Sequence, residues 1–445
     1  MTKTLKLTVL TLASLLIFLS AGLFAQTGAK DDAKKDAAAD KKALPKELPE
    51  ERRHPKYALT GLDNLIGPET TSLNPGFVIS NDAKLAEGSI WTGSYIPDRL
   101  VGLDIADVDS DGLNEVVYAT VRNVYLSRYF GGEFVQLASY SLNKTTRVVS
   151  VDLYDTDGDG RREIIVSAEV DTNHNASSSI LSYDGSKELK SLASGIPYFL
   201  RVVGQEGSRV LVAQKAGSSP SDTYGGGVHY ASFSKGKLST SSVFELPFQV
   251  NIYNFNVGDL GKDRTRLVAN IKFPTEHLVL SDFGGGKVWE SHDEYGGTTN
   301  FIELFPFGDS ARRREFLPSR ILIADIDMDG ANELIVAKNS QGGSRLFKNL
   351  RSFNSGVIEA RKFSNLSLVP FFTTGTILSL PGGAADYQIG DFDNNGTKDL
   401  VVAVVIEDGS GLLDESRSIL YSFNNLYVVP GNAPGATPAS GTANK

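Results

Sequence analysis

Four short acidic loops share one pattern of residue types that could do chemistry. Carboxylates stand at positions 1, 3, 5 and 9 of a nine-residue segment and glycine stands at position 6, most clearly in residues 155–163. Because alternate side chains of an extended segment point to the same side, the carboxylates at positions 1, 3 and 5 converge on one point. The glycine allows a backbone turn that a Cβ atom would resist. This turn brings the position-7 carbonyl and the position-9 carboxylate to the same centre.

The pattern occurs four times, once with an amide in place of one carboxylate. The predicted metal ligands, which include the backbone carbonyl of each position-7 residue, are Asp107, Asp109, Asp111, Leu113 and Glu115; Asp155, Asp157, Asp159, Arg161 and Glu163; Asp325, Asp327, Asp329, Ala331 and Glu333; and Asp391, Asp393, Asn395, Thr397 and Asp399. Carboxylates held together without a cation would repel one another, so a bound cation is expected. Oxygen-only ligands in a flexible loop favour Ca²⁺ over Mg²⁺ or a transition metal, and the sequence predicts about four calcium sites.

The four loops do not have the pattern of EF-hands. An EF-hand loop lies between two helices and has a bidentate glutamate at position 12. Here position 12 is Tyr118, Val166, Val336 or Val402. Each loop also runs into a short apolar segment typical of a strand, at residues 116–119, 164–166, 334–337 and 400–403. The loops are therefore expected between strands.

The spacing of the loops predicts a repeated architecture. Position 9 falls at residues 115, 163, 333 and 399, which leaves gaps of 48, 170 and 66 residues. The long gap has room for two further copies, and strand-like segments occur there at residues 199–213 and 258–269 without most of the carboxylates. We assign no metal to these two copies. Six copies recur about every 57 residues, a period typical of propeller blades of about four strands each.

At these loops the chain resembles the FG-GAP and VCBS repeat proteins, whose best-known fold is the seven-bladed propeller of the integrin α-subunit head. The resemblance covers residues 57–429 in architecture and implies an all-β propeller with calcium held at the rim of individual blades. No Gly-Ala-Pro follows the strands, so the chain is more similar to the bacterial VCBS-type branch than to integrin itself. We expect about seven blades, with six or eight as alternatives. Residues 57–98 and 404–429 would together form the blade that closes the ring.

The net charge and the absence of cysteine limit which partners and which stabilising interactions are expected. The formal net charge is −9 and no basic tract lies in the expected folded region, so nucleic acid is not an expected partner. The chain has no cysteine, which excludes disulfides, a lipobox and a cysteine nucleophile. An exported protein without disulfides needs another source of stability, and calcium can supply it.

Residues 1–25 have the features of a secretory signal peptide. Lys3 and Lys6 supply the positive start, residues 7–19 the apolar stretch, and residues 23–25 a cleavage site. A retained N-terminal anchor is the alternative, although the apolar stretch is short for a membrane span. Residues 26–56 are predicted to be a disordered charged linker and residues 430–445 a flexible tail. We expect a periplasmic, extracellular or cell-surface protein with no stable membrane span after signal cleavage.

No catalytic constellation stands out in the sequence. The five histidines are in no metal-ligand spacing such as H-E-x-x-H, and no G-x-S-x-G motif occurs. The acidic loops are self-contained, whereas a hydrolytic metal site keeps open positions beside a base. We therefore predict that the chain is not an enzyme. The two tryptophans, Trp91 and Trp289, lie in strand-like segments, where they either pack between blades or form a platform for a sugar.

The leading hypothesis is an exported, calcium-binding propeller that acts as a non-enzymatic binding or scaffold module for protein–protein or cell-envelope interaction. The alternatives are a carbohydrate-binding or carbohydrate-processing propeller and an envelope assembly or adhesion factor. Long insertions between strands would supply the contact surface for a protein or glycan ligand. By length and composition, the best candidates are residues 217–227 and 296–318, and replacing either is expected to remove binding without lowering the melting temperature.

Overall fold

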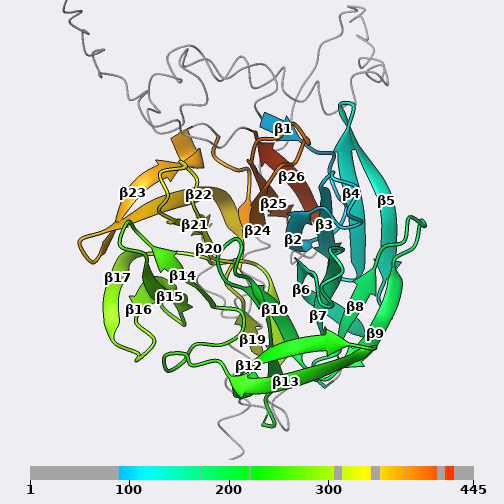
Figure 1. Cartoon of the computed structure of the whole chain (residues 1–445), viewed down its shortest axis with the longest axis horizontal. Helices are drawn as coiled ribbons and strands as arrows, with labels where there is room; N and C mark the ends of the chain where they lie inside the picture. The colour runs from blue at the N-terminus through cyan, green and yellow to red at the C-terminus, as the bar shows by residue number, and fades with distance from the viewer. Residues whose placement is uncertain are drawn as a thin grey trace, which may run out of the picture. The chain divides into compact units, whose positions relative to one another are not determined.

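The computed structural model describes residues 90–171, 173–219, 222–304, 313–341, 351–376, 378–407 and 416–424. In these residues six antiparallel four-stranded sheets are arranged around one axis as the blades of a propeller (Figure 1). The prediction of an all-β propeller is confirmed. The predicted signal peptide, charged linker and tail lie outside the described residues. No helix in the described part of the chain has the length and apolar character needed to cross a membrane.

Each blade is built from strands that follow one another outward from the axis. Blades 1 to 3 consist of β2 (Leu100–Ala106), β3 (Glu115–Thr120), β4 (Asn123–Phe130) and β5 (Glu133–Ser141); β6 (Thr146–Tyr154), β7 (Glu163–Val170), β8 (Ser178–Ser182) and β9 (Lys190–Ile196); and β10 (Phe199–Val203), β11 (Val210–Ala216), β12 (Tyr224–Ser234) and β13 (Lys237–Val243). Blades 4 and 5 consist of β14 (Phe255–Leu260), β15 (Thr265–Lys272), β16 (His277–Ser281) and β17 (Lys287–Glu294); and β20 (Leu322–Ala324), β21 (Glu333–Gln341), β22 (Phe353–Ser364) and β23 (Ser367–Thr373), followed by the short helical turn η4 (Thr374–Thr376).

Blade 6 closes the ring by joining the two ends of the described chain. It consists of β24 (Gly383–Gly390), β25 (Asp399–Glu407), β26 (Arg417–Phe423) and, outermost, β1 (Ile90–Thr92). Strand β1 pairs antiparallel with β26, with Ile90 opposite Phe423 and Thr92 opposite Tyr421. The first strand of the described chain therefore completes the last blade.

This closure explains why the described chain has six four-stranded blades where about seven were expected, with six as an alternative. The six sequence copies correspond one to one with the six blades, including the two copies without most of the carboxylates. The segments that we assigned to a seventh blade instead supply β26 and β1 of the sixth. The pairing of β1 with β26 ties the two ends of the described chain together and so closes the ring.

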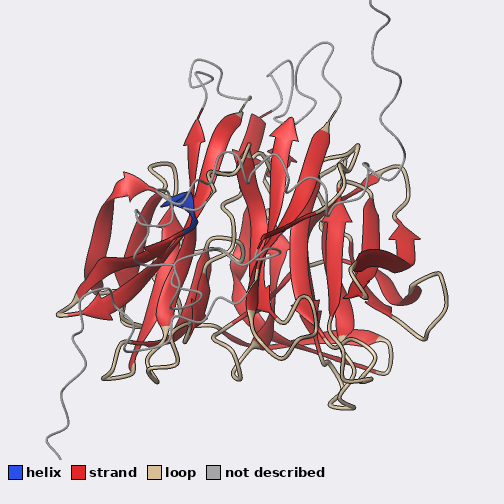
Figure 2. Cartoon of the chain, turned by 90° about the horizontal axis from the view of Figure 1, so that it is seen from above, coloured by secondary structure: helices blue, strands red, loops and turns tan. Residues whose placement is uncertain are grey.

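The inner strands are buried because both faces of each sheet pack against neighbouring blades. Strand β7 is buried at every residue except the last. One core cluster lies between blades 6 and 1 and includes Leu103, Phe392 and Leu420. Figure 2 shows the strands running side by side between two faces made of loops. The acidic loops follow the ends of inner strands on one of these faces, which we call the loop end.

A two-stranded hairpin covers the opposite end of the central channel. It consists of β18 (Phe301–Leu304) and β19 (Arg313–Phe316), inserted between blades 4 and 5. The Asn300 Nδ2 donates to the carbonyl oxygen of Val149 at 2.6 Å, near the start of the inner strand of blade 2. Ile302 is 1% exposed and packs with aromatic residues of blades 3 and 4. We call this side the hairpin end.

The hairpin corrects the expectation that residues 296–318 form a surface for a partner. The guanidinium groups of Arg147 and Arg314 each lie 4.2 Å from the centre of the Phe301 ring, which is itself buried. Thr223, within the other candidate segment at residues 217–227, donates from its hydroxyl to Glu315 of the hairpin. The described part of this insertion is thus core structure, which sequence length and composition alone do not distinguish from an exposed loop.

We expect the Ile302→Ala substitution to lower the free energy of unfolding by about 2–5 kcal/mol, because it leaves a cavity under the hairpin. Urea unfolding followed by fluorescence measures this change. The matched control is Phe248→Ala: the Phe248 side chain is 93% exposed, and its loss should alter stability by no more than about 0.5 kcal/mol. An unchanged midpoint for Ile302→Ala would mean that the hairpin does not stabilise the ring.

Candidate metal loops and the central pocket

The four acidic loops occupy equivalent places in blades 1, 2, 5 and 6. Each one connects the inner strand of its blade to the second strand, and its position-9 carboxylate is the first residue of that second strand. The position-9 residues are Glu115, Glu163, Glu333 and Asp399. The loops therefore lie together on the loop end of the ring, each fixed at both ends by a sheet.

The backbone of each loop turns at two positions. The expected glycine at position 6 has a positive φ in all four loops, with values of 89°, 91°, 84° and 91° for Gly112, Gly160, Gly330 and Gly396. Position 4 also has a positive φ, at Ser110, Gly158, Met328 and Asn394. Sequence reasoning missed this second turn. Two of the four residues at position 4 are Gly158 and Asn394, and glycine and asparagine adopt a positive φ readily. These two residues could have predicted the second turn.

A repeated hydrogen bond closes each loop at its base. The position-9 carboxylate accepts a hydrogen bond from the backbone N–H of position 2 in all four loops. The four bonds run from Val108 to Glu115 (2.8 Å), from Thr156 to Glu163 (2.9 Å), from Ile326 to Glu333 (3.0 Å) and from Phe392 to Asp399 (2.8 Å). Because one carboxylate oxygen is used by the backbone, the second strand is held in a constant position relative to the loop.

Three of the five predicted ligand positions come together in the described structure. In each loop one oxygen from position 1, one from position 3 and one from position 9 lie within 4.8 Å of one another, so each loop could hold a metal ion. The clusters are Asp107, Asp109 and Glu115; Asp155, Asp157 and Glu163; Asp325, Asp327 and Glu333; and Asp391, Asp393 and Asp399. Alternation of extended residues predicted that positions 1, 3 and 5 converge, whereas the clusters contain positions 1, 3 and 9.

The side chains at position 5 are not part of these oxygen clusters and bond to the backbone of their own loop instead. Each one accepts a hydrogen bond from the backbone N–H of position 7 in its own loop. These bonds run from Leu113 to Asp111 (2.9 Å), from Arg161 to Asp159 (2.8 Å), from Ala331 to Asp329 (2.9 Å) and from Thr397 to Asn395 (2.8 Å). That the position-5 side chains and the position-7 carbonyls also bind metal stays a prediction.

Burial makes the position-9 glutamates hard to ionise. It raises the pKa of Glu115 to about 7 and that of Glu333 to about 8, and the neighbouring Asp109 and Asp327 add to the effect. Burial also raises the pKa of Glu163. A cation among these oxygens would favour the charged form and reverse the shift. The loops thus have the electrostatic character of cation sites.

In blade 3, one of the two copies without most of the carboxylates, the loop makes contacts between blades at the loop end. In blade 3 the turn that follows β10 places the Gln205 Oε1 where it accepts from the backbone N–H of Asp259 at 2.6 Å and from the Asn332 Nδ2 at 3.3 Å. The turn therefore links blades 3, 4 and 5. That these two copies bind no metal stays a prediction.

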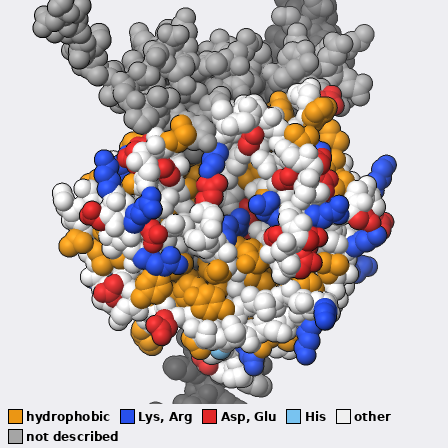
Figure 3. Space-filling model, viewed as in Figure 1, with side chains coloured by type: hydrophobic (Ala, Val, Ile, Leu, Met, Phe, Trp, Pro, Cys, Tyr) orange, Lys and Arg blue, Asp and Glu red, His pale blue; other side chains and the backbone are white. Residues whose placement is uncertain are grey.

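A pocket of about 570 Å³ lies at the centre of the ring on the loop end. The position-1 residues of three acidic loops, Asp107, Asp155 and Asp391, are among the residues that line it. Lys398 and Glu206 form an ion pair between blades 6 and 3 among the lining residues. On the face drawn in Figure 3, acidic and basic side chains are intermixed and no large patch of one sign is present.

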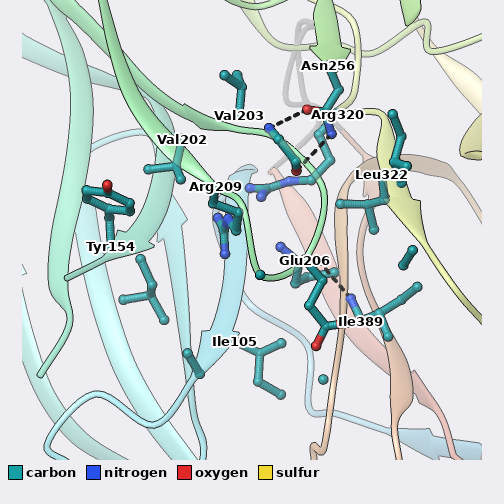
Figure 4. A pocket seen from close by; sticks show the side chains of 18 of the residues that line it. Ile105, Tyr154, Val202, Val203, Glu206, Arg209, Asn256, Arg320, Leu322 and Ile389 are labelled. Carbon is teal, nitrogen blue, oxygen red and sulfur yellow. Dashed lines mark hydrogen bonds between the residues drawn. The ribbon is translucent and has the colours of Figure 1, made fainter. Parts of the chain in front are cut away.

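A buried arginine joins three blades inside this pocket. Arg320 makes a two-pronged ion pair with Asp386, at 2.7 and 2.8 Å, and its Nη1 lies 3.1 Å from the Asp152 Oδ1. Asp104 pairs with Arg209 at 2.8 Å. Burial raises the pKa of Asp104, but Arg209 and Arg320 outweigh it and hold that pKa at about 2. Figure 4 shows Arg209 and Arg320 approaching one another within the pocket.

The sequence profile of the FG-GAP-like repeat family matches residues 107–166. These residues hold the acidic loops of blades 1 and 2 and the strands that follow them. The same loop recurs at the same place in blades 5 and 6 of the propeller. The chain is therefore a β-propeller with FG-GAP-like repeats matched in residues 107–166, and we call it the FG-GAP propeller. Its assignment to the bacterial VCBS-type branch stays a prediction.

Two solved structures are similar to the FG-GAP propeller only in general fold. The soluble aldose sugar dehydrogenase from Escherichia coli, in its apo-form, is 12% identical, with a TM-score of 0.38; the match covers 75% of this chain and 98% of that one. A protein of unknown function from Bacteroides caccae is 10% identical, with a TM-score of 0.28; the match covers 59% of this chain and 77% of that one. No curated protein matches the chain.

The prediction that the FG-GAP propeller is not an enzyme has to be corrected. It rested on the absence of a recognisable catalytic motif, and one of the similar solved structures is a sugar dehydrogenase. The absence of a recognisable motif does not by itself exclude an enzymatic function. Similarity at 12% identity carries no argument for a dehydrogenase reaction in this chain.

The tryptophans of the FG-GAP propeller pack rather than form an open platform. Trp91 is 7% exposed, and its ring lies 4.8 Å from that of Phe392 and 5.2 Å from that of Phe134. Trp289 is half-buried, and the Arg361 guanidinium lies 5.9 Å from the centre of its ring. The interpretation of Trp91 as packing between blades is correct, because its neighbours belong to blades 6 and 1.

Proposed function

We propose that this FG-GAP propeller binds calcium in its acidic loops and acts as an exported binding module for a protein or cell-envelope partner. The observation that carries the proposal is the repeated cluster of three carboxylate oxygens within 4.8 Å at one place in four blades. Repetition at one structural position distinguishes these clusters from the scattered acidic groups of an ordinary surface.

The donor set of the loops fits calcium. The side chains offered are carboxylates and one amide, and hard oxygen ligands without nitrogen or sulfur favour Ca²⁺ over a transition metal. Ca²⁺ would neutralise the carboxylates and hold the inner and second strands of a blade together at the loop end.

The export assignment rests on the sequence. The N-terminal pattern of two lysines followed by the apolar residues 7–19 is that of a secretory signal. Extracellular and periplasmic calcium can reach sites of this type, because modules outside the cell commonly bind calcium in the range of 10⁻⁴–10⁻³ M.

The loop end is the proposed contact surface. Three acidic loops border the central pocket there, whereas the hairpin covers the other end of the channel. Calcium would rigidify the loops that surround the pocket, so partner binding should depend on calcium. We do not place the contact surface on the hairpin, because its apolar side chains Phe301, Ile302, Leu304 and Phe316 are buried, although Arg313 is exposed.

Capture from cell-envelope extracts tests this proposal. The immobilised protein should retain a specific partner in calcium and release it in excess chelator. The double variant Asp155→Asn/Asp157→Asn, which weakens one loop, should release the partner at a higher free calcium concentration than the unaltered protein does. Retention that is equal with calcium and with chelator would show that the acidic loops do not control binding.

A carbohydrate ligand is the second candidate, and the central pocket favours it. The pocket is lined by arginine and amide side chains, including Arg201, Arg209, Asn256 and Gln388, together with Tyr154. Such groups hydrogen-bond to sugar hydroxyls, and a tyrosine ring can pack against a sugar face. A glycan array separates the two candidates: glycan binding that is lost in Tyr154→Ala would favour the sugar, and a protein captured from the envelope would favour the first candidate.

A further inference from the structure

The four acidic loops differ at one position that the sequence pattern does not include. In each blade this position is on the third strand, directly opposite the position-9 carboxylate. In blade 1 the pairing of Val116 with Ser127 places Arg128 opposite Glu115. In blade 5 the pairing of Leu334 with Arg361 places Lys362 opposite Glu333.

Blades 2 and 6 have neutral residues at the same position. The pairing of Ile164 with Leu181 places Ser182 opposite the position-9 glutamate of blade 2. The pairing of Leu400 with Phe423 places Asn424 opposite the position-9 aspartate of blade 6. The residue that faces the loop is therefore basic in two blades and uncharged in the other two.

The arginine in blade 1 contacts the loop carboxylates directly. Its Nε donates to Glu115, its Nη1 lies 2.8 Å from the Asp111 Oδ2, and its Nη2 lies 3.5 Å from the Asp109 Oδ1. The side chain of Arg128 is only 16% exposed. One guanidinium group thus engages three of the four carboxylates that the sequence assigns to a calcium ion.

The lysine in blade 5 also contacts three carboxylates of its loop, through its single ammonium group. The Lys362 Nζ donates to Asp327 and, at 3.0 Å, to the Asp329 Oδ2, and lies 3.8 Å from the Glu333 Oε1. The Asp325 carboxylate is not among the groups that Lys362 pairs with, and its Oδ1 has no hydrogen-bond partner. Lys362 therefore neutralises one side of this loop and leaves the other side open.

No basic residue faces the loops of blades 2 and 6 from the third strand, where Ser182 and Asn424 stand. Among the described residues, no lysine or arginine forms an ion pair with Asp155, Asp157 or Glu163 of blade 2, or with Asp391 or Asp393 of blade 6. In blade 6 the neutral Asn424 Nδ2 donates to the Asp393 Oδ2 at 3.2 Å. An amide can satisfy a carboxylate oxygen without adding a positive charge.

We propose that the loops of blades 2 and 6 are the calcium-dependent sites, whereas in blades 1 and 5 Arg128 and Lys362 are built-in counterions that take the place of the divalent cation. This inference rests on the calcium proposal above and refines it. A divalent ion entering blade 1 or 5 would have to displace a tethered positive charge from the oxygens that it needs, and would be repelled by that charge at short range. The guanidinium fork of Arg128 is the stronger competitor, because it is always charged and matches carboxylate geometry.

Exchange of the facing residues between blades tests the inference. The chelator-stripped full chain is titrated with CaCl₂, and bound ions are counted by native mass spectrometry and isothermal titration calorimetry. We expect two ions per unaltered chain and a further one in each of Arg128→Ser and Lys362→Asn. The reciprocal variants Ser182→Arg and Asn424→Lys should each lose one ion. Lys287→Asn, an exposed lysine of blade 4 that pairs with Glu290, is the control for loss of charge and should not alter the count.

The outcomes separate this inference from the calcium proposal. Four equivalent ions in the unaltered chain would overturn the inference and leave calcium binding intact. Two ions without any gain in Arg128→Ser or Lys362→Asn would also overturn it. No ion in the unaltered chain or in any variant would overturn the calcium proposal itself. If a reciprocal variant misfolds, the two gain-of-site variants still decide the question, because they only shorten side chains at the loop end.

Discussion

Withdrawing calcium is expected to lower the free energy of unfolding of the propeller by about 5 kcal/mol. A ligand that binds only the folded state at a hundred times its Kd adds about 2.7 kcal/mol per site, and two sites of this kind are proposed in blades 2 and 6. The effect has a local cause, because each loop joins an inner strand to a second strand. Without the cation, buried carboxylates such as Glu163 are held close to the other acidic groups of their loop.

Thermal and urea unfolding with calcium, with magnesium and with excess chelator measure this effect. Calcium should raise the midpoint by several degrees, and magnesium should have a smaller effect because it demands a more rigid octahedral site. The double variant Asp155→Asn/Asp157→Asn should keep only part of the calcium response, because the loop of blade 6 is unchanged. Equal midpoints with calcium and with chelator would contradict the calcium proposal.

The second large effect is expected from Arg320→Ala, which should lower the free energy of unfolding by about 3–5 kcal/mol. Removing one partner of a buried ion pair leaves the opposite charges uncompensated. Here the loss would leave Asp386 without its two-pronged partner and Asp152 without its contact at 3.1 Å. Both carboxylates are buried, so each would lose a charged partner in a poorly solvated position.

Denaturant unfolding in calcium and in chelator measures the change for Arg320→Ala. The loss should be similar in both conditions, because the arginine network is separate from the acidic clusters. Arg266→Ala is the matched control: Arg266 is 54% exposed and lies 3.7 Å from Asp259, so its loss should cost less than about 1 kcal/mol. A change for Arg320→Ala as small as that of Arg266→Ala would show that the buried network does not hold the blades together.

The sequence by itself determined the repeated unit. The carboxylates at alternate positions, the glycine at position 6 and the apolar segment that follows predict a loop between two strands, and the described structure contains this unit in four blades. The two copies without most of the carboxylates were also located correctly from the strands at residues 199–203 and 267–269. These features could be predicted because they depend on residues only a few positions apart.

Only the tertiary structure decided how the units close and what fills the centre. The pairing of β1 with β26 brings together the two ends of the described chain, and no local pattern records such a long-range partner. The hairpin at residues 301–316 appears in the sequence as a long insertion, but its apolar residues are buried by blades that are far away along the chain. Arg320 likewise joins inner strands of three blades, so its partners are distant in sequence.

The difference among the four loops also comes from the tertiary structure. The basic residue that faces the loop follows the position-9 carboxylate closely in blade 1 and much later in blade 5, where Glu333 and Lys362 are separated by the long connection between β21 and β22. The register of the third strand, and not a fixed spacing in the sequence, brings these residues together. Hydrogen bonding between strands sets that register, so a charge can face an acidic loop in two blades and be absent from it in the other two.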